Sequence, residues 1–129
     1  MAGRYNKYSD IKEEDIENYL VQQVEKMGGA AIKFNPHNNR GLPDRICFFP
    51  GGLLLLVEVK RPGERPRKNQ EKKLKAFRSL GFQATWADSW TRVDEIVAWV
   101  RKYLKTHAMG FPVEHVCYRR ECILRRNEK

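Results

Sequence analysis

One stretch, residues 41–60, constrains the fold of this chain more than any other, and it reads GLPDRICFFPGGLLLLVEVK. Pro50, Gly51 and Gly52 predict a turn between two strands, at about residues 44–49 and 53–60. The apolar run at residues 53–57 is typical of a strand that is covered on both faces, and therefore of a central position in a sheet. Charged residues at the end of such a strand are costly unless something there needs them.

The two acidic residues of this hairpin are predicted to face each other. A hairpin centred on Gly51 places Asp44 opposite Glu58, and directly opposed residues share a face with Cβ atoms about 4.5–5.5 Å apart. Two carboxylates at that separation repel each other unless a cation lies between them. Lys60 follows Glu58 by two residues and therefore points to the same face. The sequence thus predicts a metal site with a cationic neighbour.

The residue types at this site favour a hard divalent cation, Mg²⁺ or Mn²⁺, which prefers oxygen ligands. Asp44 and Glu58 would supply two carboxylate oxygens, and the backbone carbonyl of Val59 would supply a third. Lys60 would lie beside the ion, where it can orient or deprotonate a water or stabilise charge that develops on a phosphate. A phosphodiester, which is anionic and attacked by water, is the natural substrate for such a site.

Two further candidates lie on predicted helices. Glu17 is at the edge of an apolar face in line with Leu20 and Val24, so it could reach the ion directly or through a water. The alternative is a boundary glutamate that extends into solvent. Gln70, on the sheet-facing side of a later helix, could position a water. We expect Glu13 and the other acids of the first helix to be solvated.

The remaining elements are predicted from apolar spacing, capping residues and turn formers. The first helix covers about residues 11–27 after a capping box formed by Asp10 and Glu13, and a short strand follows at 30–34. Pro66 is expected to open a helix at 66–80, followed by a strand at 82–86 and a helix that starts at 88–89. The order αβββαβα predicts an α/β fold with a central mixed sheet flanked by helices. A parallel pairing of the last strand with an earlier one, through the helix between them, would be a right-handed crossover.

Positive charge is concentrated directly after the predicted metal site. The chain carries a net charge of +9, and residues 60–78 hold nine basic and two acidic residues. Such an excess indicates a polyanionic partner, either nucleic acid or a membrane surface. Phosphate contacts are favoured over simple solvated charge, and the candidates for nucleic-acid binding are Arg40, Arg61, Arg65, Arg67, Lys68 and Lys72.

Composition and cysteine usage narrow the class of protein. No apolar run approaches the length of a membrane span, and the N-terminus has no apolar signal region. Three cysteines are too few for a disulfide framework and fit a reducing, cytoplasmic setting. His115, Cys117 and Cys122 lack a fourth ligand, so no zinc site is predicted. We expect a flexible N-terminus at 1–10, one domain at 11–105 and a basic C-terminal extension at 106–129.

Several of these motifs together resemble a nuclease family. Pro43-Asp44 followed by Glu58-Val59-Lys60 resembles the signature of the PD-(D/E)xK nuclease superfamily, and the αβββαβ order resembles its restriction-endonuclease-like core. The strings GLPDRI and VEVKRPGERPRKNQ, with a helical glutamate before Gly-Gly, more narrowly resemble the VRR-Nuc domain over about residues 13–104. The resemblance implies a divalent-metal active site formed by Glu17, Asp44, Glu58 and Lys60, with Gln70 assisting.

These observations predict an Mg²⁺- or Mn²⁺-dependent endonuclease that hydrolyses DNA phosphodiester bonds. Stand-alone domains of this phage and bacterial type resemble homodimers that cut branched DNA such as four-way (Holliday) junctions in repair or recombination. A domain of this size offers one active site, and symmetric incision of a junction needs two. The alternatives are a flap-cutting, end-processing or restriction-type nuclease, an RNA-cleaving enzyme, and a non-catalytic DNA-binding module.

Overall fold

The computed structural model describes residues 10–34 and 40–107 of the chain. His115, Cys117, Cys122 and most of the predicted N-terminal and C-terminal segments lie outside the described residues. The predicted order αβββαβα is confirmed. In chain order the elements are α1 (Glu13–Lys26), β1 (Ala30–Lys33), β2 (Arg45–Phe49), β3 (Leu53–Val59), α2 (Lys68–Ser79), β4 (Gln83–Ala87) and α3 (Trp90–Thr106).

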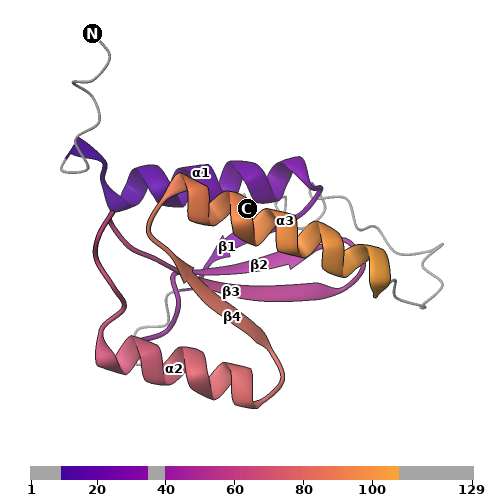
Figure 1. Ribbon diagram of the computed structural model, residues 1–129. Helices are drawn as coiled ribbons and strands as arrows, with labels where there is room; N and C mark the ends of the chain where they lie inside the picture. Colours follow the sequence, from indigo (N-terminus) through magenta and orange to yellow (C-terminus); the bar gives the residue numbers. More distant parts are fainter. Residues whose placement is uncertain (1–9, 35–39, 108–129) are drawn as a thin grey trace, which may run out of the picture.

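The four strands form one mixed sheet in the order β1-β2-β3-β4. The pairs β1–β2 and β2–β3 are antiparallel, whereas β3 and β4 are parallel and connected through α2. Helices α1 and α3 lie side by side on one face of the sheet, and α2 lies on the other (Figure 1). Strand β3 therefore has a neighbouring strand on each side and helices on both faces, as its apolar run predicts.

The register of the β2–β3 hairpin is the one that the sequence predicts. Arg45 pairs with Val57 and Phe49 pairs with Leu53, so the pairing is symmetric about Gly51. Continuing this register by one residue places Asp44 opposite Glu58. Gly51 and the glycine after it have φ angles of 96° and 92°, a left-handed conformation that strains other residues. The glycine pair thus allows the short turn that sets the register.

Side chains of β3 alternate between two hydrophobic clusters. Leu55 and Val57 belong to the larger cluster, with residues of α1 and α3, whereas Leu56 packs against Leu74 of α2. Since side chains alternate along a strand, Glu58 continues the row that faces α2. The candidate site therefore lies where this row leaves the apolar core, at the carboxyl end of β3.

Helix α1 begins at Glu13, two residues later than predicted. The expected capping box of Asp10 and Glu13 is wrong, because the backbone N–H of Lys12 donates instead to Asp15 Oδ2 at 2.8 Å. A carboxylate three residues after the first capping position satisfies an N–H group that the helix itself leaves free. The same type of cap is thus present, two residues further along.

Helix α2 also begins two residues later than predicted, at Lys68, so the expectation that Pro66 is its first residue is wrong. The side-chain oxygen of Gln70 accepts a hydrogen bond from the backbone N–H of Arg67 at 2.8 Å. Gln70 therefore caps the start of α2 by accepting from Arg67, and Pro66 is buried in the loop before the helix.

The other boundaries agree with the prediction to within one or two residues. Helix α3 starts after Ser89, whose side chain accepts a hydrogen bond from the backbone N–H of Arg92 at 3.0 Å. Tyr19 of α1 donates its hydroxyl to Asp94 Oδ1 of α3 at 2.7 Å, which ties the two helices together. Over residues 10–34 and 40–107, no helix has the length and apolar character that a membrane crossing requires.

Candidate active site

Four of the predicted site residues meet at one end of the sheet. Asp44 directly precedes β2, Glu58 lies near the end of β3, and Lys60 is the residue after β3. Gln70 comes from the first turn of α2 and contacts Glu58. The predicted constellation therefore forms from two strands that the hairpin fixes and from one helix that packs on them.

Glu58 is the most constrained member of the group. Its Oε2 atom accepts a hydrogen bond from Gln70 Nε2 at 2.7 Å and lies 3.3 Å from Lys60 Nζ. Its Oε1 atom is buried and has no hydrogen-bond partner among the described residues. Leaving a buried carboxylate oxygen unsatisfied costs about 1–3 kcal/mol or more. This oxygen is therefore available to a ligand.

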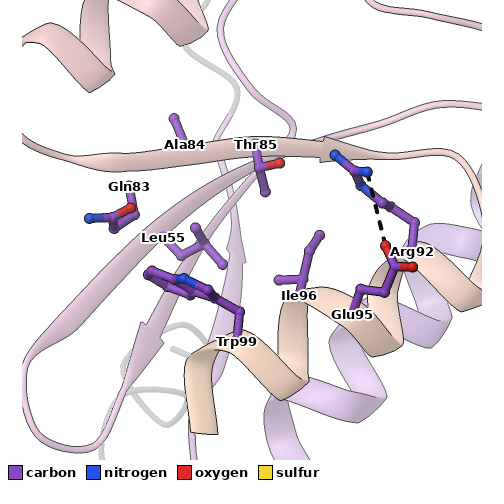
Figure 2. A pocket seen from close by; sticks show the side chains of 8 residues that line it. All are labelled: Leu55, Gln83, Ala84, Thr85, Arg92, Glu95, Ile96 and Trp99. Atoms are coloured by element: carbon purple, nitrogen blue, oxygen red, sulfur yellow. Dashed lines mark ion pairs between the residues drawn. The ribbon is translucent and has the colours of Figure 1, made fainter. Parts of the chain in front are cut away.

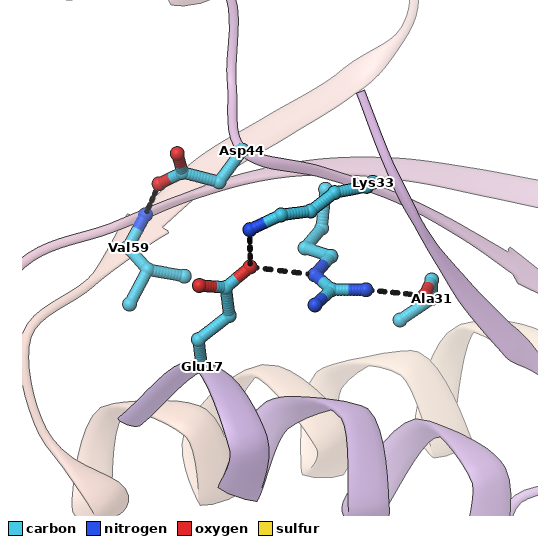
Figure 3. Close-up of polar contacts among 6 residues, drawn as sticks. Glu17, Ala31, Lys33, Asp44 and Val59 are labelled. Atoms are coloured by element: carbon cyan, nitrogen blue, oxygen red, sulfur yellow. Dashed lines mark hydrogen bonds and ion pairs between the residues drawn. The ribbon is translucent and has the colours of Figure 1, made fainter. Parts of the chain in front are cut away.

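Asp44 is held by the neighbouring strand. Its Oδ2 atom accepts a hydrogen bond from the backbone N–H of Val59 at 2.8 Å, and its other oxygen points away from Val59 (Figure 3). The contact joins the beginning of β2 to the end of β3. It fixes the Asp44 carboxylate beside Glu58 and leaves Oδ1 for another partner.

Burial is the main influence on the electrostatics of the two acids. Burial raises the pKa of Glu58 from 4.5 to about 7, with a further contribution from the charge of Asp44 that Lys60 opposes. Burial also raises the pKa of Asp44, against the hydrogen bond from Val59 N–H, which lowers it. Perturbed pKa values of this kind are typical of functional sites, and a bound cation would favour both ionised forms.

Glu17 is buried and paired, so the alternative that it extends into solvent is wrong. Its Oε2 atom accepts from Arg45 Nε at 2.7 Å and from Lys33 Nζ at 3.2 Å, and Arg45 also donates to the carbonyl oxygen of Ala31 at 2.9 Å (Figure 3). Both cationic contacts use the same carboxylate oxygen. Glu17 lies near enough to Asp44 for its charge to raise the pKa of that acid. Its role as a metal ligand stays a prediction.

Glu13 corrects a second expectation, since it is half-buried rather than solvated. Burial raises its pKa, the charge of Asp44 raises it further, and Lys60 lowers it. Glu13 therefore lies within the electrostatic field of the candidate site. The sequence held a signal for this position, because Glu13 and Glu17 are four residues apart and so share one face of the helix.

The donor set fits a hard cation that keeps part of its water shell. Among residues 10–34 and 40–107, no three histidine, cysteine, aspartate or glutamate side chains are close enough to hold a metal by themselves. Mg²⁺, however, is usually bound by one or two carboxylates together with waters and substrate phosphates. Asp44, the carbonyl of Val59 and Glu58 Oε1, which no other described residue contacts by a hydrogen bond, match that requirement.

The six residues predicted to bind nucleic acid are all exposed. None of them forms an ion pair with another described residue, so their charge is free for a partner. They are Arg40, Arg61, Arg65, Arg67, Lys68 and Lys72. Their role in phosphate binding stays a prediction.

A hollow of about 240 Å³ lies between β4 and α3, and none of the predicted site residues lines it (Figure 2). Its lining includes Leu55, Ile96 and Trp99, and the side chain of Leu55 faces the side of the sheet opposite to Glu58. This hollow is therefore separate from the candidate active site.

The fold and the paired acids with an adjacent lysine define a nuclease-type α/β domain, and comparison with known proteins gives the family. The VRR-NUC domain matches residues 3–90 of the chain. The chain thus belongs to the VRR-NUC domain family, a family of nuclease domains, and the resemblance found in the sequence is confirmed.

Two relatives support the assignment. The chain is 42% identical over 79 residues, which are 61% of this chain and 85% of the relative, to "Putative nuclease p44" of Acyrthosiphon pisum secondary endosymbiont phage 1. A solved structure described as "VRR_NUC domain" superposes with a TM-score of 0.66 at 27% identity, covering 68% of this chain and 96% of that one. The predicted fold class is confirmed.

Proposed function

We propose that this protein is an Mg²⁺- or Mn²⁺-dependent endonuclease that hydrolyses DNA phosphodiester bonds. The observation that carries the proposal is the buried Oε1 of Glu58, which has no partner in the described part of the chain and lies beside Asp44 and Lys60. Such an arrangement is costly for the fold, because burial and a second acid both oppose ionisation of Glu58. Membership of a nuclease family supports the same reading.

The ion would be held by Asp44, Glu58 and the carbonyl of Val59. Glu17 remains a candidate for a further contact to the ion, directly or through a water. Glu13 becomes a second candidate from the same helix, because the charges of Asp44 and Lys60 shift its pKa. When bound, the ion would polarise a phosphate oxygen and lower the pKa of a water.

The protein side chains divide the remaining work. Lys60 is almost fully buried beside Glu58, where its ammonium group can stabilise negative charge on the phosphate. Gln70 donates to one oxygen of Glu58 and thereby leaves the other oxygen for a ligand. Gln70 also accepts from the backbone of Arg67, so the start of α2 fixes its orientation.

We further propose that the enzyme acts on branched DNA such as four-way junctions, as a homodimer. The described residues form one candidate site, whereas symmetric incision of a junction needs two. The basic residues on and before α2 would hold the backbone on either side of the scissile bond.

The test is incubation with plasmid, linear, flap and four-way junction DNA and with RNA, in Mg²⁺, Mn²⁺ or EDTA. We expect metal-dependent incision that is strongest on the junction. Lys60→Ala should lose cleavage and largely keep binding, and Lys105→Ala, an exposed lysine at the end of α3, serves as a matched control. Cleavage confined to flaps, ends or RNA would refute the proposal that branched DNA is the substrate. Binding without cleavage by the wild-type protein under any metal would refute the enzyme.

A further inference from the structure

Two arginines from distant parts of the chain meet at one aromatic ring. The guanidinium carbon of Arg65, in the loop before α2, lies 5.8 Å from the ring centroid of Trp86 in β4. The guanidinium carbon of Arg92, in the first turn of α3, lies 5.7 Å from the same ring. Both distances are within the range of cation–π attraction. Arg92 Nε also donates to the backbone carbonyl of Trp86 at 3.3 Å.

This cluster lies next to the candidate active site. Trp86 is the register partner of Glu58, and the two strands are directly hydrogen-bonded neighbours, about 4.8 Å apart. Trp86 packs against the hydrophobic cluster of Leu56, Leu74 and Ala84, which α2 covers. Its ring is therefore on the same face of the sheet as Glu58. Strand β4 is the last strand of the sheet within the described part of the chain. The ring is half-buried and the two arginines are exposed.

The positive charge gathered here has little compensation. Arg65 forms no ion pair with any described residue, and Arg92 has only Glu95, at 4.0 Å. That pair is weak because both side chains are exposed and the separation is at the limit of contact. Arg92 reaches from α3 across to the end of β4, with Glu95 beside it on the same helix (Figure 2). Two guanidinium groups at one ring concentrate positive charge there, which attracts an anionic partner.

We propose that Arg65 and Arg92, held by Trp86, bind backbone phosphates of the DNA strand that is presented to Asp44 and Glu58. The DNA strand would then cross the edge of β4 that pairs with no other described strand. Planar guanidinium groups match the geometry of phosphate oxygens, and a side chain that is already ordered on an aromatic ring loses less conformational freedom on binding. Trp86 is a positioning residue in this site. The inference rests on the proposed nuclease function, because it uses the candidate active site as its reference point.

The test is equilibrium binding of a fluorescein-labelled four-way junction and a linear duplex in EDTA, over a range of salt concentrations. Arg65→Ala and Arg92→Ala should each reduce the slope of log K against log[salt] by about one unit, as expected for one lost phosphate contact. Arg101→Ala, an exposed arginine later on α3, is the matched control and should leave the slope unchanged. Thermal unfolding of each variant shows whether the fold is intact.

Trp86 is tested by coupling rather than by loss alone. In a Trp86→Leu background, removal of Arg92 should change affinity less than it does in the wild-type protein, and Trp86→Phe should restore the full effect. If Trp86→Leu does not fold, the salt slopes of Arg65→Ala and Arg92→Ala alone test the proposal. Unchanged salt slopes in both Arg65→Ala and Arg92→Ala would overturn the proposal. Cleavage by the wild-type protein is scored separately: cutting with unchanged slopes rejects only the phosphate site, and reduced slopes without cutting reject only the nuclease.

Discussion

Replacement of Glu58 by glutamine should stabilise the metal-free protein at neutral and alkaline pH. In the folded protein the pKa of Glu58 is raised from 4.5 to about 7, first by burial and then by the charge of Asp44. The folded state therefore binds this proton more tightly than the unfolded chain does. The resulting destabilisation is absent below about pH 4.5, grows as the pH rises to about 7, and is complete above it.

The size of the effect follows from the shift. One pKa unit corresponds to about 1.4 kcal/mol, so the raised pKa of Glu58 sets an upper limit of about 3 kcal/mol. The variant also removes the anionic partner of Lys60, whose Nζ lies 3.3 Å from Glu58 Oε2. This loss offsets part of the gain, and we expect a net stabilisation of about 1–2 kcal/mol and a rise in Tm of about 3–8 °C.

The assay is thermal unfolding of both proteins in EDTA at a series of pH values from 5 to 9. The gap in Tm between Glu58→Gln and the wild-type protein should be small at the acidic end and should widen towards pH 8. Glu14→Gln, an exposed acid of α1, is the control and should show no such gap. Equal pH dependence of Glu58→Gln and the wild-type protein would refute the assignment of a raised pKa to Glu58.

Three other substitutions address the residues around the two acids. Gln70→Ala removes a hydrogen-bond donor to Glu58 and the cap of α2. We expect the stability to fall by about 1 kcal/mol, seen as a lower Tm, and cleavage to be reduced. An unchanged Tm and unchanged cleavage would show that the Gln70 amide is dispensable. Arg45→Met leaves Glu17 buried without its closest cation and should destabilise the protein by about 2–4 kcal/mol in urea unfolding, which Glu17→Gln in the same chain should partly restore. Glu13→Gln should weaken the Mn²⁺-induced rise in Tm more than Glu17→Gln does. The reverse order would indicate that Glu17, and not Glu13, is the residue of α1 that contacts the metal.

The hairpin and its register could be predicted from the sequence because they depend on local rules. The Gly51-Gly52 turn allows a short connection, and the period of two along a strand then places Asp44 opposite Glu58. Helices α1 and α2 start two residues later than predicted, because Asp15 and Gln70 accept from the backbone N–H groups of Lys12 and Arg67, three positions earlier in each case.

The positions of Glu13 and Glu17 beside Asp44, and of Arg65 and Arg92 at Trp86, depend on how separate elements pack against each other. Which of Glu13 and Glu17 faces Asp44 is set by the packing of α1 on the sheet and by Arg45, and none of this follows from the apolar stripe of the helix alone. Arg92 reads in the sequence as one more charge on a helix surface. Its proximity to Trp86 becomes visible only once α3 is placed beside β4.

The most direct test of the central claim is cleavage of a labelled four-way junction by the wild-type protein and by Asp44→Asn, in Mn²⁺ and in EDTA. Asp44→Asn keeps the size of the side chain and an oxygen that can accept from Val59 N–H, so the fold should be retained. We predict incision by the wild-type protein in Mn²⁺ alone, and a loss of about 100-fold or more in the variant, as for other groups that stabilise a transition state. Incision in EDTA, or undiminished incision by Asp44→Asn, would contradict a metal-dependent site built on Asp44 and Glu58.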